Sequence, residues 1–188
     1  MWRQRAGLIG IFQEGEGVMR CLVTLAMIVC GAGAQARCMG EDHVFMSCTV
    51  DGGAKLLSVC IDDGVATYAF GLLGQPPDLS ISTQIADLDY TPWPGYGGSI
   101  WEEVRFYNNE YNYLVFAAVD RSGPEDANGD MIIQERGGVI VFQGDTSLAV
   151  LNCDADSLDF PWTDALSQGK ATAGLRWNMQ AGRWQPDQ

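Results

Sequence analysis

Short runs of apolar, β-branched and aromatic residues recur along the chain and are separated by turn-forming residues such as the Asp-Gly-Gly at 51–53. This pattern is typical of antiparallel strands joined by hairpins and not of alternating helices and strands. It predicts strands at 43–50, 55–60, 66–71, 79–83, 99–107, 111–119, 138–142 and 147–153. We therefore expect an all-β fold, an antiparallel sandwich or small barrel of about eight strands.

Two of the predicted strands are apolar on both faces. The runs 113–119 and 148–151 contain no charged residue, which favours central strands covered on both sides. After these strands the pattern changes, and the segment 157–169 predicts a short helix that begins near Pro161 and ends at Gly169.

Paired carboxylates occur at Glu102-Glu103 and Asp62-Asp63. A glycosidase needs two acids that face one another across the scissile bond, whereas neighbours on a strand point to opposite faces. We therefore interpret both pairs as turn and surface groups. Along 99–107 apolar and charged residues alternate, except at Trp101 and Glu102, so this strand is expected to have one solvated face.

Residues 19–36 have the features of a secretory signal peptide. Arg20 supplies the positive charge, 21–30 form an apolar core, and an A-x-A cleavage motif stands at 34–36. The core is about half as long as the roughly 20 apolar residues of a membrane-spanning helix. The sequence thus predicts export to the periplasm or the cell exterior, and a mature chain that is not held in the membrane.

The chain is accordingly divided into four parts. Residues 1–18 are interpreted as an upstream extension from a mis-assigned start, because two glutamates stand just before the positive residue of the signal. The signal peptide at 19–36 is followed by a single β domain at 37–169. Residues 170–188 form a C-terminal tail, whose two tryptophans either pack on the sheet or stay mobile.

Signal cleavage would leave four cysteines, Cys38, Cys48, Cys60 and Cys153. An even number in an exported chain predicts two disulfides. The preferred pairing joins Cys48 to Cys153 and Cys38 to Cys60, because linking distant parts constrains the unfolded chain most. A Cys48–Cys60 pair across the intervening hairpin is the alternative. The spacing lacks the C-x-x-C of a zinc site.

The formal charge is −13, which argues against binding to nucleic acid. Acidity that only maintains solubility is the favoured interpretation, and a cationic partner such as a basic protein is the alternative. His43 is the single histidine, so a Ser/His/Asp triad or a multi-histidine metal site is hard to build. The sequence therefore predicts a protein that is not an enzyme and needs no cofactor.

The run Asp126-Ala-Asn128-Gly-Asp130 begins like a calcium-binding loop, with oxygen side chains at alternate positions. The pattern then requires glycine and, further on, glutamate, where this chain has Met131 and Gly137. A polar loop between strands is the favoured interpretation, and calcium binding by Asp126, Asn128 and Asp130 is the minor hypothesis.

The segment 90–98 combines prolines, glycines and three aromatic residues, a composition suited to a loop that presents rings to a partner or a sugar. The favoured interpretation is that such a loop folds its rings over the end of a sandwich and caps the core. Trp93 and Tyr96 are the candidate binding residues, and a glycan is the second candidate partner.

The segments 45–60, 67–71, 104–115 and 138–153 resemble a group of small exported bacterial proteins of unassigned function. This resemblance implies the fold and the export, but no activity. In architecture and acidity the chain is also similar to periplasmic lysozyme inhibitors, which are small disulfide-bearing β-barrels, although their inhibitory loop signature is not recognisable here.

Together these features predict a non-enzymatic binding module of the periplasm or cell exterior. The alternatives are an inhibitor of a cationic hydrolase such as lysozyme, and a carboxylate-based glycoside hydrolase. Two carboxylates converging across a deep cleft would indicate the hydrolase, whereas exposed aromatic residues on a flat or protruding loop would indicate the binding module.

Overall fold

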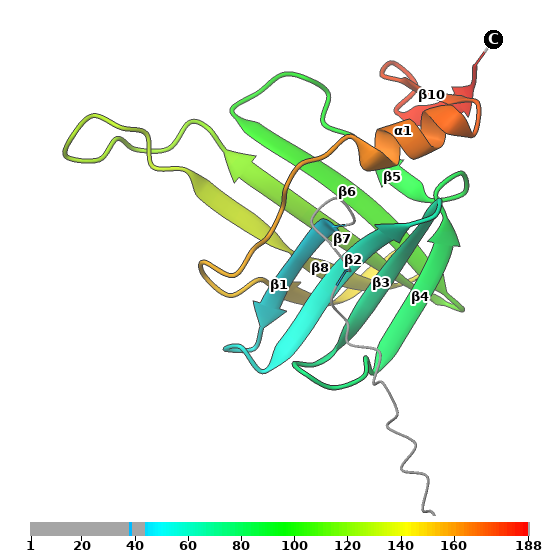
Figure 1. Ribbon diagram of the computed structural model, residues 1–188, viewed down its shortest axis with the longest axis horizontal. Helices are drawn as coiled ribbons and strands as arrows, with labels where there is room; N and C mark the ends of the chain where they lie inside the picture. The colour runs from blue at the N-terminus through cyan, green and yellow to red at the C-terminus, as the bar shows by residue number, and fades with distance from the viewer. Residues whose placement is uncertain (1–37, 39–43, 188) are drawn as a thin grey trace, which may run out of the picture. The chain divides into compact units, whose positions relative to one another are not determined.

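The computed structural model describes residues 38 and 44–187. The predicted upstream extension, the signal peptide and His43 lie outside the described residues. The elements, shown in Figure 1, are β1 (Val44–Val50), β2 (Lys55–Asp62), β3 (Val65–Leu72), β4 (Leu79–Gln84), β5 (Asp89–Thr91), β6 (Ser99–Asn108), β7 (Tyr111–Asp120), β8 (Gln134–Gln143), β9 (Thr146–Asn152), α1 (Ala165–Thr172), β10 (Leu175–Asn178) and β11 (Arg183–Pro186).

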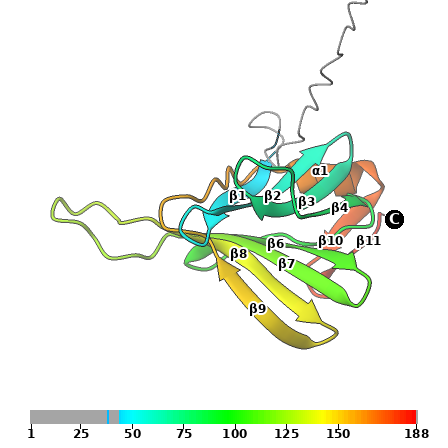
Figure 2. The ribbon, with the colours of Figure 1, turned by 90° about the horizontal axis from the view of Figure 1, so that it is seen from below.

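The fold is all-β with one short helix in the described residues, as the sequence predicts. Strands β1 to β4 form one antiparallel sheet, β5 to β9 form a second, and β10 pairs with β11 in a separate hairpin. The two larger sheets lie face to face as a sandwich (Figure 2). Each of the eight predicted strands is present, and the short strands β5, β10 and β11 are additional.

The core fills the space between the two larger sheets. Because successive side chains of a strand point to opposite faces, every second residue of the central strands enters it. The largest fully buried side chains come from both sheets, from the segment between β4 and β5, and from α1: Tyr68, Tyr90, Phe106, Met46, Leu57, Leu88 and Leu166.

Strand β9 is not the covered central strand that its apolar run predicted. It forms the end of the five-stranded sheet, beside β8 only, and six of its seven residues are exposed. Leu148 and Val150 are each more than half exposed. The prediction was wrong because apolar residues on both faces of a strand show that it can be covered on both sides, but not that other elements cover it. No further strand or helix of residues 44–187 covers this one.

The helix lies later in the chain than predicted. It begins at Ala165, so Pro161 precedes it by a full turn, and Gly169 lies inside it. A Cβ atom at position 169 would come within 2.7 Å of the Ile85 side chain. Gly169 is therefore explained by close packing against Ile85. The chain leaves the helix at Gly174, where φ is +75°.

The predicted tail contains the end of α1 and the hairpin of β10 and β11, and Trp184 packs against the sandwich. Its ring stacks on Tyr90 at 5.8 Å, and its Nε1 donates a hydrogen bond of 2.8 Å to the Tyr90 carbonyl oxygen. Trp177 contacts Trp184 at 5.6 Å. Of the two outcomes left open for these tryptophans, packing is the one observed.

Lys170 fastens the helix to the turn before β5. Its side chain is buried, and Nζ donates hydrogen bonds to the carbonyl oxygens of Ala86, at 3.0 Å, and Leu88. The ammonium also lies 5.8 Å from the Trp184 ring centre. Burial lowers the pKa of Lys170, although nearby Asp87 and Asp89 oppose that shift.

Two disulfides are present, in the preferred pairing. Cys38 is bonded to Cys60 on β2, across 22 residues, and Cys48 on β1 is bonded to Cys153, across 105 residues. The second bond ties the first strand to the residue that follows β9. Two disulfides are consistent with an oxidising compartment.

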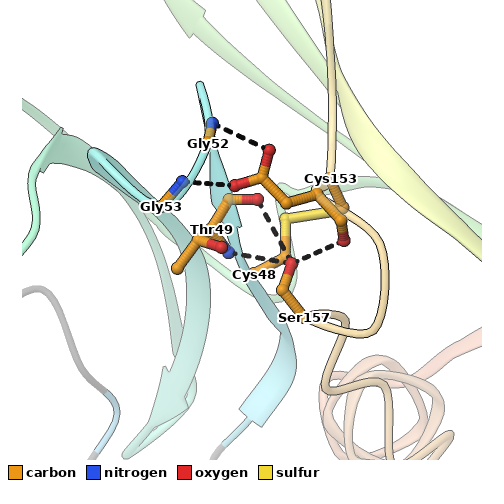
Figure 3. The surroundings of a disulfide bond; sticks show 7 residues. Cys48, Thr49, Gly52, Gly53, Cys153 and Ser157 are labelled. Carbon is orange, nitrogen blue, oxygen red and sulfur yellow. Dashed lines mark hydrogen bonds between the residues drawn. A yellow bond between two sulfur atoms is a disulfide. The ribbon is translucent and has the colours of Figure 1, made fainter.

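Hydrogen bonds surround the Cys48–Cys153 disulfide (Figure 3). The carboxylate of Asp154 accepts the backbone N–H groups of Gly52 and Gly53, at 3.0 and 2.7 Å. The Ser157 hydroxyl accepts the N–H of Thr49 and donates to the carbonyl oxygen of Asp154. This network holds the chain after β9 against the first hairpin. The hydrogen bonds from the backbone N–H groups of Gly52 and Gly53 lower the pKa of the Asp154 carboxyl group.

Within residues 44–187 no helix has the length and apolar character needed to cross a membrane.

Candidate functional site

A cleft of about 580 Å³ opens where the loop after β5 meets the start of α1. Its walls come from three separate parts of the chain, and only the tertiary structure brings them together. They are the loop after β5, strand β6, and the segment that enters the helix. The lining residues are Pro92, Trp93, Glu102, Trp162, Thr163, Asp164 and Ser167.

Two tryptophans form one wall of the cleft. The rings of Trp93 and Trp162 meet edge to face, with centres 5.6 Å apart and an angle of 78° between their planes. The guanidinium of Arg121 lies 5.2 Å from the Trp93 ring centre, in cation–π range. Trp162 remains 45% exposed. The cleft thus offers solvent a large aromatic surface.

Trp162 has a left-handed backbone, with φ of +46°. A bulky residue rarely adopts this region, and the conformation costs roughly 1–3 kcal/mol. Strain of this kind concentrates at binding and catalytic positions, so Trp162 is a strong functional candidate.

Glu102 lies at the inner end of the cleft. It shares the inward-facing side of β6 with Val104 and Phe106, and is only 5% exposed. Its Oε1 accepts a 2.7 Å hydrogen bond from the Tyr90 hydroxyl. Burial raises the pKa of the carboxyl to about 7, and the hydrogen bond from Tyr90 partly opposes this. Glu102 is therefore buried, and its prediction as a surface group was wrong.

Tyr90 holds the Glu102 carboxyl in place. Its hydroxyl also lies 3.3 Å from Oγ of Ser167, on the first turn of α1. Burial and the neighbouring Glu102 carboxylate raise the Tyr90 pKa well above its usual range, so this phenol stays protonated. Because Trp184 packs on the Tyr90 ring, the C-terminal hairpin supports the base of the cleft.

Asp164 brings a second carboxyl group to the same cleft. It directly precedes α1, and its Oδ2 accepts a 2.6 Å hydrogen bond from the Gln168 side chain one turn along. The cleft thus combines two carboxyl groups. Glu102 is buried and changes protonation near neutral pH, and Asp164 directly precedes the helix. Such groups can hydrogen-bond to hydroxyls or transfer a proton.

The structure separates the two binding residues that the sequence suggested. Trp93 lines the cleft, and its Nε1 donates a 3.1 Å hydrogen bond to the carbonyl oxygen of Tyr96. The Tyr96 side chain is 70% exposed and is not among the residues that line the cleft. Tyr96 therefore shapes the loop through its backbone.

The candidate calcium residues lie in the long loop between β7 and β8, which projects from the sandwich in Figure 1. Oδ1 of Asp126 accepts the backbone N–H groups of Asn128 and Asp130, at 2.8 and 2.9 Å. These bonds lower the Asp126 pKa. The carboxylate is thus turned toward its own loop, the arrangement of a polar turn.

A second hollow, of about 630 Å³, lies beside Cys153 and is bordered by Glu135, Asp154 and Asp156. The Asp154 carboxylate is less available to a ligand in this hollow, because it already accepts two hydrogen bonds from the backbone of the first hairpin. The cleft at Glu102 has both the strained residue and the perturbed acid, and is therefore the stronger candidate.

Three cleft residues, Trp162, Asp164 and Ser167, come from a segment in which the sequence suggested only a misplaced helix. In the sequence these residues form only a common pattern, a tryptophan and a polar residue just before a helix. That pattern is too frequent in proteins to indicate a functional site. Glu102 carried a clearer signal. It interrupts the alternation along β6 at an inward position, where a carboxyl group is unusual.

The chain matches no protein-family model, and comparison with curated proteins and with solved structures gives no match either. The chemistry of the cleft is therefore what indicates the function.

Proposed function

We propose that the protein is an exported, non-enzymatic binding module that holds a neutral saccharide in the cleft lined by Trp93 and Trp162. The observation that carries the proposal is the strained, exposed Trp162 above the buried Glu102 carboxyl. Two disulfides and the predicted signal peptide support a periplasmic or extracellular location.

The cleft has the mixture of groups that a sugar requires. Indole rings supply a large apolar surface for the C–H faces of a pyranose ring. The carboxyl groups of Glu102 and Asp164 supply directional partners for its hydroxyls. The charge of −13 repels anionic glycans, which favours neutral or amino-substituted saccharides.

The proposal is tested by titrating the oxidised protein with chitotetraose, cellotetraose and maltotetraose, followed by tryptophan fluorescence and calorimetry. At least one is expected to bind with one-to-one stoichiometry. Trp93→Ala is expected to weaken that binding at least tenfold, because it removes half of the aromatic wall of the cleft. The control Tyr96→Ser, outside the cleft, should change the affinity less than twofold. Equal losses in both variants would contradict the assignment.

Trp162→Gly separates binding from stability. Glycine adopts a positive φ without strain, and the relief of roughly 1–3 kcal/mol partly offsets the lost contact with Trp93 and the lost burial of the indole ring. We therefore expect saccharide affinity to fall at least tenfold while the urea midpoint of unfolding falls only slightly. A clear loss of stability together with unchanged affinity would show that Trp162 has a structural role.

A carboxylate-based glycoside hydrolase is the second candidate, and the pKa of Glu102 favours it. A carboxyl that stays protonated near neutral pH can act as a general acid, and Asp164 is the second carboxyl in the same cleft. Glu102→Gln keeps the shape of the side chain and removes its ionisation. A binding module would retain its affinity and release no reducing ends, whereas a hydrolase would release them and lose at least 100-fold in rate with this variant.

A further inference from the structure

The outer face of the five-stranded sheet is the side of β6–β9 that points away from β1–β4. Its position follows from the strand register, in which each outward residue of β7 pairs with outward residues of β6 and β8. No element of residues 44–187 covers the middle of this face in Figure 2. Its large apolar side chains are half-buried or exposed: Trp101, Leu114, Phe116, Ile140, Phe142 and Val150.

The outer face also contains a hollow. A depression of about 190 Å³ is bordered by Trp101 on β6, Phe116 on β7 and Arg136 on β8. This depression can accommodate side chains of an opposing protein surface. Apolar side chains that are grouped on a sheet face with no covering element commonly mark an interaction site.

The charges of this face differ from those of the whole molecule. The chain has a net charge of −13, but the outward positions of β5–β8 hold three acidic and two basic side chains, Asp89, Glu103, Asp120, Arg105 and Arg136. Both arginines are paired on this side of the sheet, Arg136 with Asp120 at 2.9 Å and Arg105 with Asp89, on the adjoining strand β5, at 3.6 Å. The face is therefore apolar and almost neutral.

We propose that a second copy of this chain docks on the outer face with the same face, and so forms a symmetric dimer. A basic partner would find a surplus of only one acidic side chain on this surface, and an anionic partner would find its arginines already paired. Two copies of an acidic protein repel one another, and they approach at least cost where the charge is balanced.

The size of the face fits a reversible dimer. Strands about 4.8 Å apart and about 3.3 Å per residue give β6–β9 a face of roughly 20 by 30 Å, or about 600 Å² per copy. Specific interfaces begin at about 600 Å² per partner. We therefore expect a dimer that dissociates at micromolar concentrations.

The test is sedimentation equilibrium of the full oxidised protein between about 1 and 200 µM, with Val150→Lys and Leu72→Lys as matched variants. Both residues are about half exposed in one copy, so neither change should unfold the chain. Val150 lies on the outer face, whereas Leu72 ends β3 in the other sheet. Val150→Lys is expected to raise the dissociation constant at least tenfold, and Leu72→Lys less than twofold.

Salt provides an independent readout. Raising NaCl from about 50 to 500 mM should tighten the dimer, because it screens repulsion between two copies of net charge −13. A protein that remains monomeric at 200 µM, a dimer that salt loosens, or equal weakening by both lysine variants would each overturn the proposal.

Discussion

Replacing Cys48 and Cys153 by alanine is expected to lower the free energy of unfolding by about 5 kcal/mol, against about 3 kcal/mol for Cys38 and Cys60. The difference follows from loop length, since the first bond closes 105 residues and the second 22. A longer closed loop removes more conformations from the unfolded chain. Domains of this size have only about 5–15 kcal/mol in total, so the first variant should be close to unfolding.

The measurement is urea unfolding of the wild type and the two double variants at one pH. The urea dependence should be steeper without the 105-residue crosslink, because the unfolded chain then exposes more surface. Cys48 is also a core side chain, so its alanine variant loses some packing. Reduction of the wild type by a thiol removes both bonds without that loss and serves as the control. Equal destabilisation by the two double variants would contradict the loop argument.

Glu102→Gln is expected to stabilise the protein by about 3 kcal/mol at pH 8 and to have little effect below pH 4.5. Burial raises the pKa of this carboxyl from 4.5 to about 7 in the folded protein. The folded state therefore retains the proton to a higher pH than the unfolded chain does. The contribution of this group is complete below pH 4.5 and is lost as the pH rises through 7. Glutamine does not ionise and avoids that loss.

The experiment compares urea unfolding of the wild type and the variant from pH 4 to pH 8. Only the difference between the two proteins isolates Glu102, because the other acidic groups contribute equally to both. Glu125→Gln, on the exposed loop between β7 and β8, is the control and should parallel the wild type. A difference that stays constant with pH would show that Glu102 ionises at the same pH in the folded and unfolded chains.

Both features of the candidate site reduce stability. The ionised form of Glu102 opposes folding above neutral pH, and the backbone of Trp162 is held in a strained conformation. Proteins keep such costs where binding or catalysis requires them. This is why the same two residues carry the functional proposal and the expected trade-off with stability.

The strand pattern and the cysteines were readable from the sequence because their signals are local or follow a general rule. Alternating apolar runs with turn residues between them predicted each strand of the two sheets except the three-residue β5. The preferred disulfide pairing followed from chain entropy, which depends only on separation along the chain.

Tertiary structure decided which surfaces are covered and which residues meet. The apolar run in β9 was consistent with a covered strand, yet it became an exposed edge because nothing described packs beyond it. The sequence pattern predicted that Gly169 ends the helix. In the structure Gly169 lies inside the helix, where the lack of a side chain lets Ile85 pack closely against it. Local pattern gives the faces of an element, but not its neighbours.

The candidate site shows the same division. By itself, the sequence determined the all-β fold, the short helix and the preferred disulfide pairing, and it marked Trp93 as a binding candidate. Only the tertiary structure placed Trp93, Glu102 and Asp164 around one cleft, because they stand on separate segments whose approach depends on the packing of α1 against the sheet. The burial that raises the pKa of Glu102 exists only after that packing, since desolvation is a property of the assembled environment.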